Sequence, residues 1–518
     1  MSRSIHASSA TVITRRGLSI PATMATQHPD HASRPFFAEH EFLSATDEVK
    51  EAVIAFRDLG CHEVLWDWQG TFVDESVVDR FYSDYLDYFR TKQLGRDVFV
   101  SFYLPLIWKE SPVRTRRAYS TIISASDTAR DMKFHAPAVF EVVIPMTDQG
   151  EKMMRVVSDY NTVVAAARDS LHRDCGPKLV SIIPFIEDIY HCFGSPSIIS
   201  DFVNSYQSKF RCKIDYLRPL ISRNDAALVG GLIPAVMATK AALAQYARFE
   251  KHTGIKVYPI IDAGSSIFRG GLSPSSIHLF LSTYPGAKTV TIQSAFRYDH
   301  DIAHVKSAIR KLNEQIPKTK PQFIDGQTIQ ECGQLCALFS SFYKKTSKNI
   351  AKTIIELSDN IPARRERAKP TEQQSTMNIA SERKQPLPDS VRFTAMCYSL
   401  GIPPEVIGTG RGILEAIRTE KIKTLERVYP TIKEELLCAG HYLNKENLAF
   451  LCDLSDAWSD VKKDVSLIED YLGKTLGPTT TSQVLHRNHT SNVFHLWRAK
   501  EDVREDLMKA ARLRRFLG

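Results

Sequence analysis

Seven apolar runs rich in β-branched residues recur along residues 63–294, and most of them end in charged or polar residues. Their starts lie roughly 34–41 residues apart, about the length of one strand plus one covering helix. Continuous apolar runs are typical of strands that are buried on both faces of a parallel sheet. The runs are Glu63–Trp68, Val98–Pro105, Ala138–Pro145, Leu179–Glu187, Asp215–Arg223, Ile255–Ala263 and Thr289–Ser294.

Seven or eight such units in series predict an α/β fold, a (β/α)8 TIM-like barrel with extensive additional helices. In this fold, polar residues at the carboxyl ends of the strands build the active site. We expect the barrel to begin near Ala45, with clear helical patterns at Glu75–Arg90 and Pro234–Glu250. No clear eighth strand is visible, and the short stretch Met377–Ala380 is a weak candidate for it.

The 518 residues exceed what a barrel of roughly 250–350 residues needs, so the chain is expected to carry an extension. Residues 1–17 are predicted to be a flexible lead-in. Residues 18–390 are predicted to form the catalytic barrel, including a long polar loop at 360–390 that is rich in Arg, Lys, Gln, Ser and Pro. Residues 391–518 return to a helical pattern, which predicts a helical carboxyl-terminal extension packed on the barrel.

The amino-acid composition limits the classes of protein to which this chain can belong. Hydrophobic residues make up 43% of the chain and charged residues 24%, which is ordinary for a globular enzyme. The chain contains no run of 18 apolar residues, and its first residues form no apolar stretch of a secretory signal, so we expect no membrane partner. Nine cysteines are scattered without CxxC pairs, which favours reduced thiols and a cytoplasmic location.

The net charge of +8 admits three interpretations: nucleic-acid binding, attraction of a small anionic substrate, or no function. Basic residues cluster at Arg364, Arg365 and Arg367, but few aromatic residues lie between them and no nucleic-acid motif is present. We therefore expect no nucleic-acid partner and favour attraction of an anion into the barrel mouth.

Two carboxylates follow neighbouring predicted strands. Glu187 ends the fourth run and Asp225 lies just past the fifth. Two converging oxygen ligands, completed by water and substrate, suit Mg²⁺ or Mn²⁺. The alternative is that both are rim carboxylates in ion pairs with arginines such as Arg223.

Arginines and a histidine are expected at the same mouth. The segment Gly264–Gly271 carries Arg269 after the sixth run, and Arg297 follows the seventh. A guanidinium offers a planar fork for carboxylate or phosphate, although these segments could also be a plain turn and a surface ion pair. His28 stands before a proline in a non-helical segment, which suits a positioned acid or base, although an isolated histidine is more often structural. Arg411 lies in a glycine-rich turn that lacks the GxGxxG spacing.

From about Leu18 to Gly518 the chain resembles the archaeal-type phosphoenolpyruvate carboxylases. Each segment alone is weak evidence, but the combination in this order is specific. The segments are Pro21–Asp30, Glu63–Gly70, Phe140–Thr147, Pro184–Asp188, Arg223–Leu228, Ala238–Lys240, Gly264–Gly271, Thr291–Asp299 and Tyr398–Arg411.

The resemblance implies carboxylation of phosphoenolpyruvate with bicarbonate to oxaloacetate and phosphate, with Mg²⁺ or Mn²⁺ and in a homotetramer. It implies that His28 handles a proton of a carboxyphosphate intermediate and that Glu187 and Asp225 hold the metal. It matches Arg269 to the arginine of the glycine-bearing loop. We further expect Arg269 and Arg297 to be catalytic, and Arg223 and Arg411 to bind substrate together with Arg269.

The chain departs from the family pattern where Tyr103 replaces an arginine, Gln69 an acid and Ile267 a proline, and Arg383 is only an incomplete match to a further arginine. Two alternatives therefore stay open: another metal-dependent barrel lyase that handles an enolate, and a catalytically altered or lapsed paralogue. If the enzyme is active, a basic residue after the second run is expected to compensate for Tyr103. The candidates are Lys109, Arg114, Arg116 and Arg117.

Overall fold

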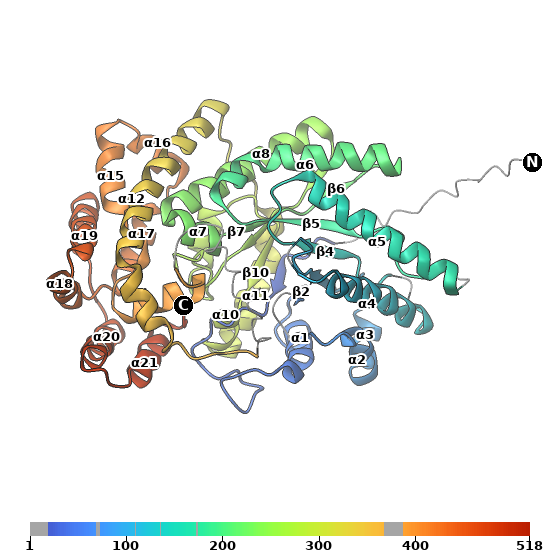
Figure 1. Cartoon of the computed structure of the whole chain (residues 1–518), viewed down its shortest axis with the longest axis horizontal. Coiled ribbons are helices and arrows are strands. Elements are labelled where there is room, and N and C mark those ends of the chain that lie inside the picture. The colour runs from blue at the N-terminus through green and yellow to red at the C-terminus, as the bar shows by residue number, and fades with distance from the viewer. Residues whose placement is uncertain (1–18, 69–72, 109, 135, 172–174, 367–386) are drawn as a thin grey trace, which may run out of the picture.

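The computed structural model of the chain describes residues 19–68, 73–108, 110–134, 136–171, 175–366 and 387–518 (Figure 1). Eight parallel strands close a barrel in the order β1-β10-β9-β7-β5-β4-β3-β2, which confirms the predicted (β/α)8 class. The strands of the barrel are β1 Thr23–Ala25, β2 Glu63–Asp67, β3 Phe99–Tyr103, β4 Glu141–Ile144, β5 Ser181–Ile186, β7 Leu220–Ser222, β9 Ile260–Asp262 and β10 Thr289–Ile292.

Two of the predicted runs are each divided into two strands. β6 (Tyr216–Leu217) precedes β7, and β8 (Lys256–Val257) precedes β9. The short strands β6 and β8 pair with each other outside the barrel, whereas β7 and β9 pair within it. Pro219 and Pro259 stand between the two pieces of each run. Proline has no N–H group to donate, so each run changes partners at that residue.

The eighth strand is β1, which lies between β10 and β2. Thr23 is in register with Val290, and Met24 with Glu63. The barrel therefore begins before Ala45, contrary to our expectation. The three residues of β1 are too few to show a strand period, which is why the pattern of apolar residues missed them. The other candidate, Met377–Ala380, lies outside the described residues.

Helices cover the outside of the barrel between successive strands (Figure 1). The predicted helix Glu75–Arg90 is divided at Tyr85, where φ is −136°, and the predicted Pro234–Glu250 lies within α8. These helices are α1 Glu48–Arg57, α2 Val77–Asp84, α3 Leu86–Thr91, α4 Pro112–Asp131, α5 Gly150–Leu171, α6 Ile189–Phe210, α7 Asn224–Gly230, α8 Leu232–Thr253, α9 Ile277–Thr283, α10 Ser294–Tyr298 and α11 Ile302–Gln315.

A helical layer lies beside the barrel, at the left of Figure 1. It includes the 33-residue α12, so it begins before the expected residue 391. Phe268 donates its N–H to Glu405 at 2.7 Å, which ties the layer to the loop after β9. Its helices are α12 Gly326–Ser358, α14 Ser390–Ser399, α15 Thr409–Arg418, α16 Ile422–Val428, α17 Ile432–Gly440, α18 Lys445–Leu454, α19 Ser459–Leu472, α20 Thr481–Ala499 and α21 Arg504–Arg514.

Of the predicted polar loop at 360–390, residues 367–386 lie outside the described residues, as does the predicted lead-in at 1–17. The start of the loop is firmly attached. Arg365 forms a parallel bridge with Leu43, and its side chain donates two hydrogen bonds to Glu51.

The two ends of the barrel interior differ in chemistry. Near the amino ends of the strands, the buried Arg218 forms ion pairs with Glu63 and Glu141, both at 2.6 Å. Above this cluster lies an apolar layer that includes Leu65, Ile183 and Ile260. The amino end is therefore filled, and a pocket can open only at the carboxyl end.

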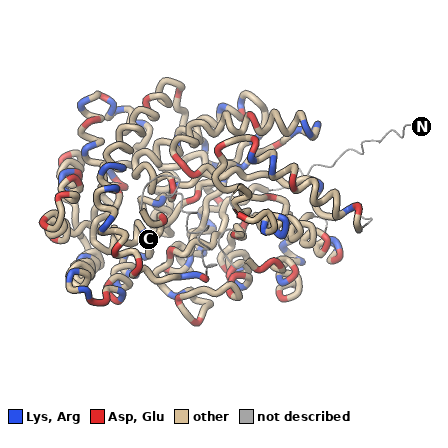
Figure 2. Tube along the Cα trace, viewed as in Figure 1, with Lys and Arg blue, Asp and Glu red and all other residues tan. Residues whose placement is uncertain are grey.

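Basic and acidic residues are interspersed along the trace in Figure 2, so the basic residues are not gathered in one part of the fold in that view. Within the described part of the chain, no helix is long and apolar enough to cross a membrane.

Candidate active site at the carboxyl end of the barrel

A pocket of about 220 Å³ opens at the carboxyl ends of the strands. Its lining combines four carboxylates, one histidine, a tyrosine and an apolar floor, and its described part contains no arginine or lysine. The lining residues are Thr26, Gln27, His28, Leu65, Asp67, Tyr103, Leu106, Met146, Phe185, Glu187, Leu220, Asp225, Asp262 and Thr291. Three of the predicted site residues, His28, Glu187 and Asp225, are thus brought together in one pocket.

The segment that follows β1 is fixed along its length, and this places His28. The Thr26 N–H donates to Ile292 at 3.2 Å, and the Thr26 hydroxyl lies 2.9 Å from His28 Nδ1. Gln27 Oε1 accepts the N–H of Asp67 at 2.9 Å. These contacts hold the imidazole at the pocket wall, where its side chain is one-third exposed at 33%.

Asp30, two residues after His28, is a second fixed point of this segment. Its Oδ1 accepts the N–H of Ala295 at 2.9 Å, and its main-chain oxygen accepts the N–H of Leu517 at 2.7 Å. Because β1 is only three residues long, these contacts beyond the strand help to fix the segment that carries the histidine.

Glu187 and Asp225 come from neighbouring strands, as predicted. Glu187 follows β5 and Asp225 lies in the first turn of α7, after β7, and β5 pairs with β7 in the barrel. The Ser222 hydroxyl donates to Asp225 Oδ2 at 2.9 Å and accepts the Asp225 N–H at 3.0 Å, so this carboxylate has a defined orientation. Oxygen donors of this kind fit Mg²⁺ or Mn²⁺.

Two further carboxylates of the pocket, Asp67 and Asp262, are absent from our predicted set. Both are the last residues of barrel strands, β2 and β9. Their position at strand ends is the sequence signal that identifies them, since polar residues at the carboxyl ends of barrel strands build the site.

Tyr103, at the end of β3, lies among the four carboxylates. Burial and the nearby charges of Glu187, Asp67, Asp225 and Asp262 raise the pKa of its phenol well above 10. It is therefore a neutral hydroxyl at any physiological pH. Its ring packs edge-on against Phe185, with 5.9 Å between ring centres.

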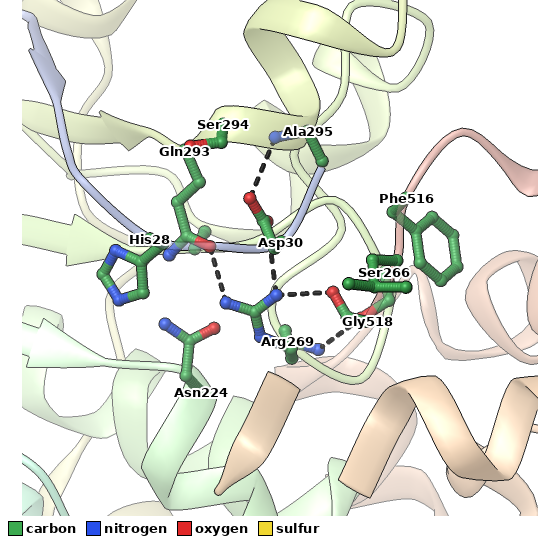
Figure 3. Close-up of polar contacts among 12 residues, drawn as sticks. His28, Asp30, Asn224, Ser266, Arg269, Gln293, Ser294, Ala295, Phe516 and Gly518 are labelled. Carbon is green, nitrogen blue, oxygen red and sulfur yellow. Dashed lines mark hydrogen bonds and ion pairs between the residues drawn. The ribbon is translucent and has the colours of Figure 1, made fainter. Parts of the chain in front are cut away.

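Arg269 lies behind the pocket wall and is fully buried (Figure 3). Its Nη1 donates to Asp30 Oδ2 at 3.2 Å and to the Gly518 main-chain oxygen at 2.5 Å, and its Nη2 donates to Gln293 Oε1 at 2.6 Å. The guanidinium thus joins the segment that carries His28 to the loop after β10 and to the end of the helical layer. It does not line the pocket.

Arg297 and Arg223 are also buried outside the lining. Arg297 donates to the Thr26 main-chain oxygen at 2.6 Å and forms an ion pair with Glu51 at 3.0 Å, so it supports the end of β1. Arg223 donates through Nε to the Tyr284 hydroxyl at 2.6 Å. Its two terminal nitrogens have no hydrogen-bond partner among the described residues.

Arg411, which we expected to bind substrate, is not brought to this pocket. It lies in α15 of the helical layer, where it donates to Asp464 from Nε at 2.9 Å and from Nη2 at 2.7 Å, and pairs with Asp460 at 2.8 Å. A carbon added at Gly410 would come within 2.1 Å of the Asp464 main-chain oxygen. The glycine-rich turn therefore serves close helix packing here.

Three of the four basic residues expected to compensate for Tyr103 lie away from the pocket lining. Arg114 donates to the Trp68 main-chain oxygen at 2.7 Å and pairs with Glu110 at 3.1 Å. Arg117 pairs with Glu75, and Arg116 is exposed. None of these three residues lines the described pocket, whereas Lys109, Gln69 and Arg383 lie outside the described residues.

Comparison with known proteins gives one consistent result. A family profile described as phosphoenolpyruvate carboxylase matches residues 20–518. A phosphoenolpyruvate carboxylase of Oenococcus oeni is 31% identical over 509 residues, covering 96% of this chain and 99% of its own. One of Methanospirillum hungatei is 32% identical over 519 residues, covering 97% and 100%. One of Metallosphaera sedula is 30% identical over 485 residues, covering 90% and 93%.

The matched region contains the barrel, the pocket and the helical layer, and the similarity extends to relatives from both archaea and bacteria. The chain belongs to the archaeal-type phosphoenolpyruvate carboxylase family.

Proposed function

We propose that this protein carboxylates phosphoenolpyruvate with bicarbonate, giving oxaloacetate and phosphate. The observation that carries the proposal is the convergence of His28, Glu187 and Asp225 on one pocket at the carboxyl end of a barrel whose family has this activity. The pocket is small and partly lined by the apolar side chains of Leu65, Phe185 and Leu220, which suits a reaction that must keep an enolate away from water.

Glu187 and Asp225 are the proposed ligands of a divalent cation, Mg²⁺ or Mn²⁺. Their oxygens come from adjacent strands, and the Ser222 hydroxyl orients one of them. When bound, the cation would supply positive charge to stabilise the anionic substrates, in a pocket whose described lining is rich in carboxylates.

His28 is the proposed proton acceptor. After bicarbonate attacks the phosphoryl group, the products are an enolate and carboxyphosphate. His28 would take the carboxyl proton of carboxyphosphate, the bond between its carbon and the bridging oxygen would break, and CO2 and phosphate would form. The proton then passes to the phosphate, and the enolate carbon attacks CO2.

Arg269 and Arg297 are proposed to serve this chemistry from behind the wall. Both are fully or almost fully buried, and both bind the segment that carries His28, at Asp30 and Thr26. A direct catalytic or substrate-binding contact of either arginine, or of Arg223, stays a prediction.

The activity is tested by measuring phosphate release and oxaloacetate formation with and without bicarbonate. We expect both products to require bicarbonate, phosphoenolpyruvate and a divalent cation. Phosphate release that does not respond to bicarbonate would instead favour the alternative, a barrel lyase or phosphatase that handles the enolate alone.

A cytoplasmic location and a homotetramer are also part of the proposal. All nine cysteines are free thiols, as expected in a reducing compartment. Light scattering of the purified protein measures the mass of the assembly, and a mass other than four chains would reject the tetramer.

A further inference from the structure

A chain of polar contacts runs between His28 and Arg269 through two residues that have no role in the chemistry above. Asp262 Oδ2 lies 4.0 Å from His28 Nε2. Asp262 Oδ1 accepts a hydrogen bond from Gln293 Nε2 at 2.9 Å. Gln293 Oε1 accepts one from Arg269 Nη2 at 2.6 Å, as the dashed line in Figure 3 shows.

The Asp262 carboxylate is held in one orientation. Besides Gln293, it accepts hydrogen bonds from the Thr291 hydroxyl at 2.9 Å and from Asn224 Nδ2 at 2.5 Å. These donors stand after β7, in β10 and after β10, so the carboxylate is fixed from three directions, and only 3% of the residue is exposed. Its negative charge therefore has a defined place beside the imidazole.

The orientation of the Gln293 amide is also determined. A guanidinium can only donate hydrogen bonds, so the amide oxygen must face Arg269. The amide nitrogen then necessarily faces Asp262, which as a carboxylate accepts. Reversing the amide would place two donors together on one side and two acceptors on the other, so Gln293 can connect Arg269 to Asp262 in only one orientation.

We propose that Asp262 is the positioning residue of His28, fixing its ring and stabilising the imidazolium that forms during the reaction, and that Gln293 couples this pair to Arg269. The inference rests on the proposed role of His28. The proton involved is the carboxyl proton of carboxyphosphate, which His28 accepts and then returns to phosphate, so no further reactant is needed.

The 4.0 Å separation decides how Asp262 acts. It is longer than a hydrogen bond, so the contact is one of charge. On the other side of the ring, the Thr26 hydroxyl lies 2.9 Å from Nδ1. With a carboxylate facing Nε2 and a hydroxyl facing Nδ1, the imidazole is held between two fixed groups, and a positive charge on it is favoured at the moment when the proton arrives.

The test is the variant Asp262→Asn, which keeps the size of the side chain and removes its charge. Oxaloacetate and pyruvate are measured in the same reaction, together with phosphate. We expect oxaloacetate formation to fall on the order of 10²-fold, while phosphate release changes little and pyruvate takes the place of oxaloacetate. A structural defect would lower both products equally, so the ratio of the two products reports on the proposed role.

Asp464→Asn is the matched control. Asp464 is a fully buried aspartate in the helical layer, bound to Arg411 and to the Gly408 N–H. We expect it to lower the melting temperature and to leave the ratio of oxaloacetate to pyruvate unchanged. A ratio that shifts equally in both variants would overturn the inference.

His28→Asn separates this inference from the proposed function. If His28→Asn leaves the product ratio unchanged, the role of His28 itself is wrong. If it shifts the ratio and Asp262→Asn does not, only the role of Asp262 is wrong. If the two residues act as a unit, the double variant is no worse than His28→Asn alone.

If Asp262→Asn does not fold, the variant Gln293→Met provides a second test of the inference. It leaves the carboxylate with Thr291 and Asn224 but removes its connection to Arg269. We expect the product ratio to shift toward pyruvate, by less than in Asp262→Asn, and an unchanged ratio would contradict the coupling.

Discussion

Replacing Arg269 with lysine is the sharpest test of the site, because the change keeps the positive charge and removes the planar fork. Arg269 uses two terminal nitrogens to reach three acceptors on three different segments: Asp30, Gln293 and Gly518. A lysine presents one nitrogen at the end of a flexible stem, and it cannot reach all three acceptors at once.

The expected loss follows from these contacts. If two of the three hydrogen bonds are lost, at about 1.5–3 kcal/mol for each bond to a charged group, the expected effect is about 3–6 kcal/mol. If the whole effect falls on the transition state, kcat/KM drops by roughly 10²–10⁴. Because Arg269 does not line the pocket, we expect the loss mainly in kcat, through displacement of the segment that carries His28.

The assay measures kcat and KM for phosphoenolpyruvate together with the melting temperature. Arg411→Lys is the matched control, since Arg411 is another buried arginine with several acceptors but lies away from the pocket. It should lose stability and retain kcat. An Arg269→Lys enzyme within about threefold of wild type, a difference under 1 kcal/mol, would refute the reasoning. A raised KM in Arg411→Lys would restore its predicted role in substrate binding.

Three other predictions concern the pocket and the interface with the helical layer. Glu187→Gln or Asp225→Asn should lower turnover by at least about 10²-fold and weaken Mn²⁺ binding, measured by titration of the metal, with an unchanged melting temperature; normal metal dependence would contradict the assignment. Tyr103→Arg places a cation among four carboxylates and should raise the metal concentration for half-maximal activity about tenfold or more, since ~1.4 kcal/mol of repulsion gives that factor; a gain in activity at unchanged metal dependence would instead indicate that the natural chain is a weakened enzyme. Burial raises the pKa of Glu405 to about 7, so the folded state holds this proton more tightly than the unfolded state, and stability is lost as pH rises from about 4.5 to 7. Glu405→Gln should flatten the melting temperature across this range, and an identical pH profile in both proteins would show that the carboxyl does not titrate there.

The barrel was predictable because its strands are apolar on both faces and regularly spaced. The strand closing it was not predictable in this way, because β1 contains only Thr23–Ala25 and its stability comes from pairing with β10 and β2. A short strand held by partners distant in sequence leaves almost no local period. Pro219 and Pro259 likewise reveal a break in the strands but not that the two outer pieces pair with each other.

The sequence predicts where the pocket carboxylates lie better than it predicts where the arginine side chains lie. Strand ends alone indicate Glu187 and Asp225, and would also have indicated Asp262. The position of an arginine in the sequence does not say whether its long side chain enters the pocket or turns behind the wall. Arg269 turns toward Asp30 and Gln293, and Arg411 toward Asp464, because those acceptors come from segments far away in the chain.

The position of β1 also has a consequence for the synthesis of the chain. The segment that carries His28 is made before the other barrel strands, yet β1 has no partner on one side until β10 has been made, since Thr23 is in register with Val290. Closing so long a loop is slow and late in folding. A growing chain therefore holds an open sheet with two unpaired edges for most of its synthesis, which favours binding by chaperones. Closure of the barrel by β10 brings His28 to the other pocket residues, but the contacts of Asp30 with Leu517 and of Arg269 with Gly518 can form only after the helical layer has also been made.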